Sequence, residues 1–173
     1  IDGDGRQDTL VQVQNSSGGG GWQVLYSNGT SFVAGELLAT TVDSGTQSFT
    51  LPTLLDMNGD GCSDAVYHAS GSWRLATSKC RRVGTGALNT AVTLGVSNPA
   101  SFAVVVAGDA NGDGNQDMVI SVGYPYAGTL YLSTGVGFGA GIALPSYPMP
   151  SSPTGTAGVS ALIDLDGDGL PDA

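Results

Sequence analysis

Thirteen of the 15 acidic residues fall into four short clusters. Three clusters read DMNGDGCSD from residue 56, DANGDGNQD from residue 109 and DLDGDGLPD from residue 164. The first, DGDGRQD after Ile1, lacks only the opening position. All four fit the pattern D-x-[DN]-G-D-G-x-x-D. Unit charges about 4 Å apart repel by about 1 kcal/mol even in water, so we expect a cation among them.

The pattern suits Ca²⁺, which takes several oxygen ligands in flexible geometry. Positions 1, 3, 5 and 9 offer side-chain oxygens, and position 7 offers its backbone carbonyl whatever its side chain is. Glycine at positions 4 and 6 allows the positive φ that a tight loop needs. Mg²⁺ demands stricter octahedral geometry, and the chain is poor in the His and Cys that zinc prefers.

We therefore predict Ca²⁺ in three complete loops and one truncated loop. The predicted ligands are Asp2, Asp4, Arg6, Asp8, Asp56, Asn58, Asp60, Cys62, Asp64, Asp109, Asn111, Asp113, Asn115, Asp117, Asp164, Asp166, Asp168, Leu170 and Asp172. The alternative is that these are ordinary Asp-Gly and Asn-Gly hairpin turns. Four matches in the same register favour the metal.

The clusters also define a repeat. Position 5 of the pattern recurs at Asp4, Asp60, Asp113 and Asp168, at intervals of 56, 53 and 55 residues. Periods near this length are typical of solenoids, propellers and arrays. The predicted units are residues 1–55, 56–108 and 109–163, with 164–173 starting the next.

Each unit contains short extended segments separated by turn residues, and Leu10 to Gln14 alternates as a half-buried strand should. We predict an all-β fold of antiparallel four-stranded propeller blades in an incomplete ring. The strand before each loop is the innermost one, and Pro52 is tolerated there if that strand is a blade edge. The predicted strands are Thr9 to Gln14, Trp22 to Tyr26, Phe32 to Thr40, Phe49 to Leu55, Ala65 to Ala69, Trp73 to Thr77, Thr90 to Leu94, Phe102 to Ala107, Met118 to Val122, Thr129 to Leu132, Ala140 to Leu144 and Val159 to Ile163.

The four loops, Gly137-Phe138-Gly139-Ala140 and the shorter echo Asn28 to Phe32 resemble tandem FG-GAP or VCBS-type repeats. Such repeats form calcium-loop propeller blades in integrin α heads and in secreted bacterial proteins. The second unit departs from the family at Cys80 to Gly84. The resemblance implies a secreted or cell-surface module, and its members bind ligands, adhere, carry toxins or scaffold enzymes.

Propellers usually have 4 to 8 blades, so three repeat lengths should not close alone. We expect flanking blades or self-association to complete the ring.

The net charge of −10 opposes nucleic-acid binding, and no apolar run reaches the roughly 18 residues of a membrane span. Cys62 and Cys80 can form a disulfide across a hairpin, which would favour an oxidising compartment, or can remain free thiols.

We expect no catalysis, because the only histidine, His68, falls within a predicted strand. Trp22 and Trp73 occupy matching repeat positions, which indicates blade packing, with a sugar-stacking platform as the alternative. The sequence thus predicts an extracellular, calcium-stabilised module for protein interaction, adhesion or structural assembly. A carbohydrate-binding propeller and a part of a secreted hydrolase or toxin remain as alternatives, and the protein or glycan ligand is not identified.

Overall fold

The computed structural model describes residues 1–14, 20–38, 52–69, 71–84, 86–96, 103–122 and 127–144. All regular structure in these ranges is β-strand, and the sheets are antiparallel, so the all-β prediction is confirmed. The described residues contain no helix that could cross a bilayer. The predicted strand Val159 to Ile163 lies outside the described residues.

Three sheets form the body of the molecule, and we call them blades 1, 2 and 3. Blade 1 consists of β1 (Thr9–Gln14), β2 (Gly20–Ser27) and β3 (Phe32–Leu37). Blade 2 consists of β4 (Thr53–Leu55), β5 (Asp64–Ala69), β6 (Ser72–Ala76) and β9 (Val92–Thr93). Blade 3 consists of β10 (Ala103–Gly108), β11 (Asp117–Val122), β12 (Ala127–Tyr131) and β13 (Ile142–Ala143).

The strand before each acidic loop belongs to the sheet that follows the loop. β4 pairs only with β5, and β10 pairs only with β11 within its sheet, so each is a blade edge. Pro52 immediately precedes β4. Its missing N–H therefore interrupts no ladder, as the sequence analysis required.

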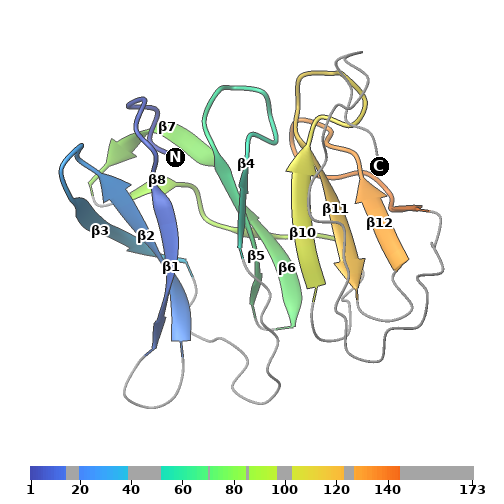
Figure 1. Cartoon of the computed structure of the whole chain (residues 1–173), viewed down its shortest axis with the longest axis horizontal. Helices are drawn as coiled ribbons and strands as arrows, with labels where there is room; N and C mark the ends of the chain where they lie inside the picture. The colour runs from blue at the N-terminus through green and yellow to red at the C-terminus, as the bar shows by residue number, and fades with distance from the viewer. Residues whose placement is uncertain are drawn as a thin grey trace.

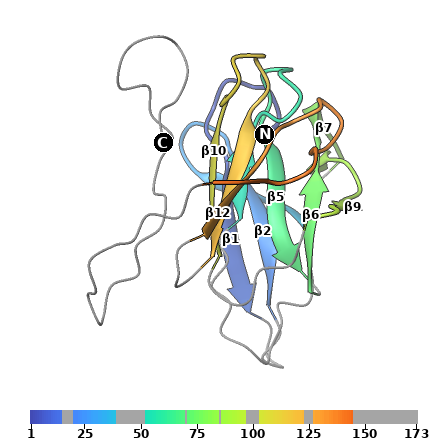
Figure 2. The ribbon, with the colours of Figure 1, turned by 90° about the vertical axis from the view of Figure 1, so that its right-hand side faces the viewer.

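The blades stand side by side, with blade 2 between blades 1 and 3 (Figure 1). Seen from the side, the strands of the three sheets overlap along one common direction (Figure 2). The connections that carry the first three acidic clusters lie at the same end of the strands (Figure 1). This arrangement brings loops that are more than 50 residues apart in sequence to one face of the molecule.

Two apolar clusters fill the seams between the blades. In the first, Trp22, Val24 and Tyr26 of blade 1 pack with residues of β5 and β6 such as Tyr67. Full burial of one such side chain contributes about 1.5–3 kcal/mol. Alternation along β2 directs its even-numbered side chains toward blade 2.

The second cluster joins blade 2 to blade 3. Trp73 and Leu75 of β6 pack against Met118 and Ile120 of β11. Trp22 and Trp73 are thus both buried between blades, which confirms the packing role predicted for them. The sugar-stacking alternative for these two indoles is wrong, because neither ring face is open to a ligand.

A hairpin that the sequence analysis did not foresee leaves blade 2 and lies against blade 1. It consists of β7 (Ser78–Val83) and β8 (Gly86–Leu88), and it falls where the second unit departs from the other repeats. The strand predicted at Thr90 to Leu94 follows it and is reduced to the two residues of β9.

Glu36 on β3 fastens this hairpin to blade 1. Its Oε1 accepts hydrogen bonds from the backbone N–H groups of Ala87 (3.0 Å) and Leu88 (2.8 Å). Its Oε2 accepts a bond of 2.7 Å from the Tyr26 hydroxyl. The Arg82 guanidinium lies 4.4 Å from the centre of the Tyr26 ring. Glu36, one of two acids outside the loop clusters, therefore has a structural role.

We predict that Glu36→Ala destabilises the protein by about 2–4 kcal/mol, because it leaves the buried Leu88 amide and the Tyr26 hydroxyl without their acceptor. The Ala87 amide keeps the Tyr26 hydroxyl as an acceptor at 2.7 Å. Urea denaturation followed by circular dichroism would measure this loss. Glu36→Gln keeps one acceptor oxygen and should lose less. Equal stability of Glu36→Ala and the unmodified chain would contradict the role given to this carboxylate.

Candidate functional site

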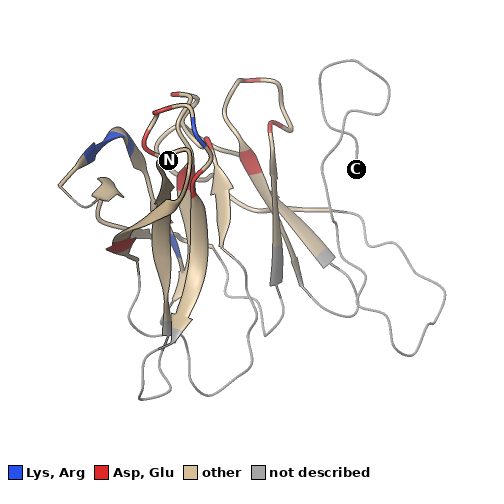
Figure 3. Cartoon of the chain, turned by 60° about the vertical axis from the view of Figure 1, so that its left-hand side comes forward, with Lys and Arg blue, Asp and Glu red and all other residues tan. Residues whose placement is uncertain are grey.

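Three acidic loops gather at one end of the blades, where Figure 3 shows most of the Asp and Glu positions. Loop 1 (residues 2–8) precedes β1, loop 2 (56–64) joins β4 to β5, and loop 3 (109–117) joins β10 to β11. The fourth cluster lies outside the described residues and comprises Asp164, Asp166, Asp168, Leu170 and Asp172.

The loop backbones follow one conformation. Gly59 and Gly61 of loop 2 have φ values of 68° and 84°. The glycines at the same positions of loops 1 and 3 have φ values between 73° and 88°. Positive φ at both positions is what the calcium-loop pattern required, and it explains why glycine stands there.

In loop 2 the side-chain oxygens of positions 1 and 3 turn toward the loop's own amides. Asp56 accepts hydrogen bonds from the N–H groups of Asp60 (3.0 Å) and Gly61 (2.8 Å). Asn58 Oδ1 also lies 3.2 Å from the Asp60 nitrogen, and Asp60 Oδ1 accepts from Cys62 N–H at 2.9 Å. The oxygens predicted to bind a cation are therefore held on the inner side of the loop.

Loop 3 has the same four hydrogen bonds at the same positions of the pattern. Asp109 accepts from the N–H groups of Asp113 (3.1 Å) and Gly114 (2.8 Å), and Asn111 Oδ1 lies 2.9 Å from the Asp113 nitrogen. Asp113 Oδ1 accepts from Asn115 N–H at 2.8 Å. The two complete loops among the described residues thus present the same oxygen donors in the same order.

Loop 1 shares the later part of this arrangement. Asp2 Oδ1 accepts from Asp4 N–H at 3.3 Å, and Asp4 Oδ1 accepts from Arg6 N–H at 2.9 Å. The Arg6 guanidinium forms an exposed ion pair with Asp4 at 3.4 Å. Its side chain points to a neighbouring acid, which leaves the backbone carbonyl as its only candidate metal ligand.

The aspartate at position 9 has a role that the sequence analysis missed. Asp64 is fully buried, and its two oxygens accept from Met57 N–H in its own loop (3.1 Å) and from Ser78 N–H after β6 (2.6 Å). Asp117 is equally buried and accepts from Ala110 (2.9 Å) and Ser133 (2.7 Å). Each carboxylate therefore clamps the start of its loop to the end of the second following strand.

The clamp recurs in loop 1, where Asp8 accepts from Ser27 N–H at 3.0 Å and from the Ile1 amino group at 2.9 Å. In all three blades the clamped residue is a serine at the end of the strand or two residues after it. Its recurrence was the signal in the sequence that could have revealed the clamp. The three residues are Ser27, Ser78 and Ser133.

These serines also connect neighbouring blades. The Ser78 hydroxyl of blade 2 donates to the Ile1 carbonyl of loop 1, and the Ser133 hydroxyl of blade 3 donates to the Met57 carbonyl of loop 2, both at 2.6 Å. Loop 2 is also held by Gln116, whose N–H donates to the Asp56 carbonyl and whose Oε1 accepts from Asp56 N–H, both at 2.8 Å. The acidic loops therefore lie at the seams between blades.

Burial raises the pKa of Asp64 to about 6, although the N–H groups of Ser78 and Met57 oppose the shift. The nearby charges of Asp60 and Asp56 raise it further. Burial likewise raises the pKa values of Asp117 and Asp2. These carboxylates crowd their loops with negative charge, and a bound divalent cation would relieve that repulsion.

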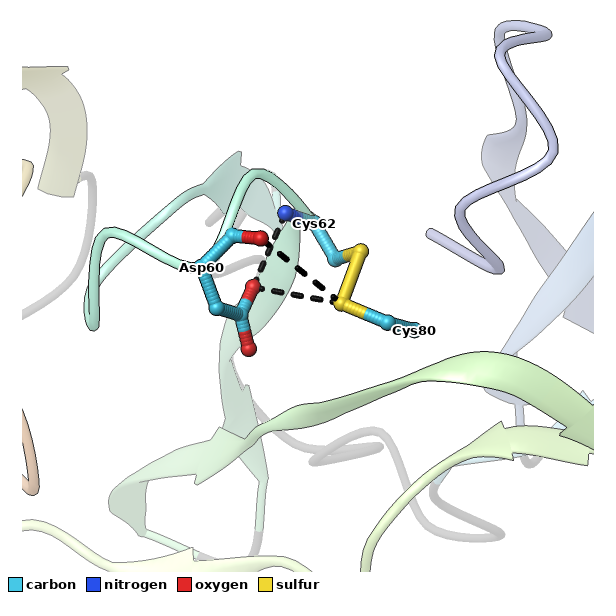
Figure 4. Close-up of side chains that lie close together, drawn as sticks. All are labelled: Asp60, Cys62 and Cys80. Carbon is cyan, nitrogen blue, oxygen red and sulfur yellow. Dashed lines mark hydrogen bonds between the residues drawn. A yellow bond between two sulfur atoms is a disulfide. The ribbon is translucent and has the colours of Figure 1, made fainter.

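Cys62, at position 7 of loop 2, forms a disulfide with Cys80 of β7, and their Cα atoms are 5.5 Å apart (Figure 4). Cys80 Sγ lies 3.4 Å from Asp60 Oδ1. Among the described residues, these three are the one group of His, Cys, Asp or Glu whose potential ligand atoms lie within 4.8 Å of one another. Because its sulfurs are bonded to each other, this group is not a thiolate metal site.

His68 lies on β5, so the prediction that it falls within a strand is confirmed. Its ring packs edge-to-face on Trp73 with a centroid separation of 5.5 Å. Lys79 and Arg81 are exposed on β7. None of these residues belongs to the acidic loops.

Residues 109–173, which begin at loop 3, match the family model of the FG-GAP-like repeat. The chain carries an FG-GAP-like repeat. This confirms the resemblance drawn from the loops, and FG-GAP repeats are typical of extracellular modules of the β-propeller type. The search of curated proteins gave no match.

In chelator, we predict that the free energy of unfolding increases as the pH falls from about 6 to about 4. Asp64 has a folded-state pKa of about 6 against 3.8 for the free side chain, so the folded state takes up its proton first in this range. Asp8 and Asp113 have lowered pKa values, so their opposite contributions come below this window. Urea denaturation at several pH values would measure the trend.

Saturating calcium is the control, because a cation beside the carboxylates should remove or reverse the trend. A metal-free protein that loses stability steadily from pH 6 to pH 4 would contradict this account of Asp64.

Proposed function

We propose that the chain is an extracellular, calcium-stabilised module of β-propeller blades that serves protein interaction, adhesion or structural assembly without catalysis of its own. The observation that carries the proposal is the repetition of one acidic loop, with one backbone conformation, at the seams between packed blades. A cation in such a loop would stabilise two blades at once.

The donor set fits Ca²⁺. Loops 2 and 3 offer carboxylate and amide oxygens at positions 1, 3 and 5, and backbone carbonyls are available at position 7. Oxygen donors of mixed type are what Ca²⁺ prefers, whereas zinc would need nitrogen or sulfur. The residues that would hold the ion in the two loops are Asp56, Asn58, Asp60, Cys62, Asp109, Asn111, Asp113 and Asn115, with Asp64 and Asp117 behind them.

A bound ion would supply positive charge, and the chain's own residues would supply the coupling to the fold. The position-9 carboxylate already holds the loop to its own sheet, and the position-2 carbonyl already holds it to the neighbouring blade. Stiffening the loop therefore stiffens both contacts. We infer that calcium acts on stability and blade geometry and takes no part in a reaction.

The family match and the disulfide support an extracellular setting, because disulfides persist in oxidising compartments. The non-catalytic proposal is supported by the position of His68, which packs on a buried tryptophan away from the acidic loops. The carbohydrate-binding alternative relied on Trp22 and Trp73 as stacking platforms, and both side chains are buried.

Calcium titration by isothermal calorimetry, paired with thermal unfolding, would test this function. We predict dissociation constants of about 10⁻⁴ to 10⁻³ M, typical of extracellular modules. Each site should add about 2.7 kcal/mol of stability at a calcium concentration 100-fold above its dissociation constant. Chelator should lower the melting temperature correspondingly.

Asp113→Asn should weaken binding at loop 3 and remove part of the calcium-dependent gain in stability. Asp43→Asn is the matched control, because it removes one carboxylate outside the four clusters. No heat of binding and an unchanged melting temperature in chelator would rule out the calcium proposal.

A further inference from the structure

Loop 3 holds the backbone of loop 2 through the residue at its position 8. Gln116 Oε1 accepts a hydrogen bond of 2.8 Å from the Asp56 N–H, and the Gln116 N–H donates one of 2.8 Å to the Asp56 carbonyl. Both residues are half-buried. Because the two bonds run in opposite directions, they fix the orientation of the Asp56 backbone as well as its position.

The residues joined in this way belong to neighbouring metal loops. Asp56 is position 1 of loop 2, and its carboxylate is a predicted ligand that already accepts from the amides of Asp60 and Gly61. Gln116 directly follows Asn115, whose backbone carbonyl is the predicted position-7 ligand of loop 3. The contact therefore connects a ligand of one loop to a ligand of the next.

One peptide group makes this connection. The carbonyl of Asn115 and the N–H of Gln116 are the two ends of the same planar unit, so they move together. The carbonyl faces the proposed ion of loop 3, and the N–H bonds to Asp56 of loop 2. Groups bonded in such a chain also polarise one another, so a positive charge at the carbonyl strengthens the N–H as a donor.

The two loops also touch directly where loop 2 carries a glycine. A Cβ atom at Gly59, position 4, would lie 3.1 Å from Asn115 Oδ1 and 3.2 Å from the Gly114 carbonyl oxygen. The neighbouring seam repeats this contact, since a Cβ atom at Gly3, position 4 of loop 1, would lie 3.3 Å from Cys62 Sγ of loop 2. Position 4 of one loop therefore packs against position 7 of the next at both described seams.

We propose that calcium binding in loops 2 and 3 is coupled, and that Gln116 is the positioning residue that couples it. With the Asn115 carbonyl bound to an ion, the peptide group that holds Asp56 is fixed before loop 2 is filled. A site that is already ordered loses less conformational entropy on binding, so each ion raises the affinity for the other. This inference deepens the calcium-stabilised function proposed above and rests on it.

Charge acts on the same two loops without Gln116. Ions in neighbouring loops repel each other, and that repulsion is weakened by salt, whose screening length is about 8 Å at 0.15 M ionic strength. The carboxylates of each loop attract the ion of the other loop in a similarly screened way. The coupling assigned to Gln116 is therefore the part that disappears with its side-chain oxygen.

Calcium titration of the full chain, followed by nuclear magnetic resonance, tests the coupling because each loop has its own probe. The amides of Gly61 and Gly114 donate to the position-1 carboxylates of loops 2 and 3, both at 2.8 Å. The shift of each amide with calcium concentration gives the dissociation constant of its own loop.

Asp113→Asn weakens loop 3 by removing a charge while keeping the oxygen that accepts from the Asn115 N–H. We expect it to raise the dissociation constant read at Gly61, in loop 2, by at least about fivefold. Asp60→Asn should raise the constant read at Gly114 by a similar factor, because coupling between binding sites is reciprocal.

Gln116→Met separates the coupling from a merely structural role. It keeps the length of the side chain and removes the oxygen that accepts from Asp56. In this background Asp113→Asn should change the loop 2 constant by about twofold or less, because the bond that remains does not fix the orientation of Asp56. Lost stability alone would leave the fivefold ratio unchanged.

Two further variants serve as controls. Gln116→Glu retains an acceptor oxygen and should restore the ratio, although its charge shifts both constants. Gln7→Met makes the matched substitution at position 8 of loop 1, where the side chain is exposed, and should leave the ratio as in the unmodified chain.

A loop 2 constant unaffected by Asp113→Asn would overturn the coupling, and equal ratios with and without Gln116→Met would overturn the role of Gln116. In both cases calcium-dependent shifts at Gly61 and Gly114 would leave the calcium proposal standing. The absence of any shift at either glycine would overturn the coupling and the calcium proposal together, so the two failures are distinguished.

Discussion

The buried carboxylate at position 9 of the three described loops is the contact on which the architecture depends. Burying a charged carboxylate costs free energy unless hydrogen-bond donors replace the lost water. Asp64 and Asp117 each accept hydrogen bonds from two backbone N–H groups in different parts of their blade. This fixes the loop against the end of the second following strand. The serine at that strand end is then placed to bond the loop of the neighbouring blade.

One loop therefore serves three purposes. It turns the chain between two strands, it anchors its own sheet, and it presents a carbonyl to the next sheet. The remaining acids of the loop gain no such burial, and their mutual repulsion opposes folding unless a cation lies among them. Blade 2 adds a disulfide from loop 2 to its extra hairpin, which ties this loop covalently to the segment that covers blade 1.

Much of the fold follows from local pattern. Period-two alternation in Leu10 to Gln14 predicts β1, and the recurrent glycines predict the positive φ that the structure has in all three described loops. The hairpin of β7 and β8 could not be predicted in this way, because its Arg82 and the backbone of β8 are held by Tyr26 and Glu36 of blade 1. Residues about 50 positions apart in sequence carry no local signal of their contact.

The sequence by itself determined the repeat, the all-β class and the oxygen-rich chemistry of the loops, because periodicity, glycine conformation and charge density are properties of neighbouring residues. Only the tertiary structure decided that Asp64 and Asp117 are buried clamps, that Trp22 and Trp73 fill seams, and that Glu36 holds the hairpin of β7 and β8 against blade 1. Burial depends on which sheet lies opposite a side chain, and that is set by packing between segments far apart in the chain.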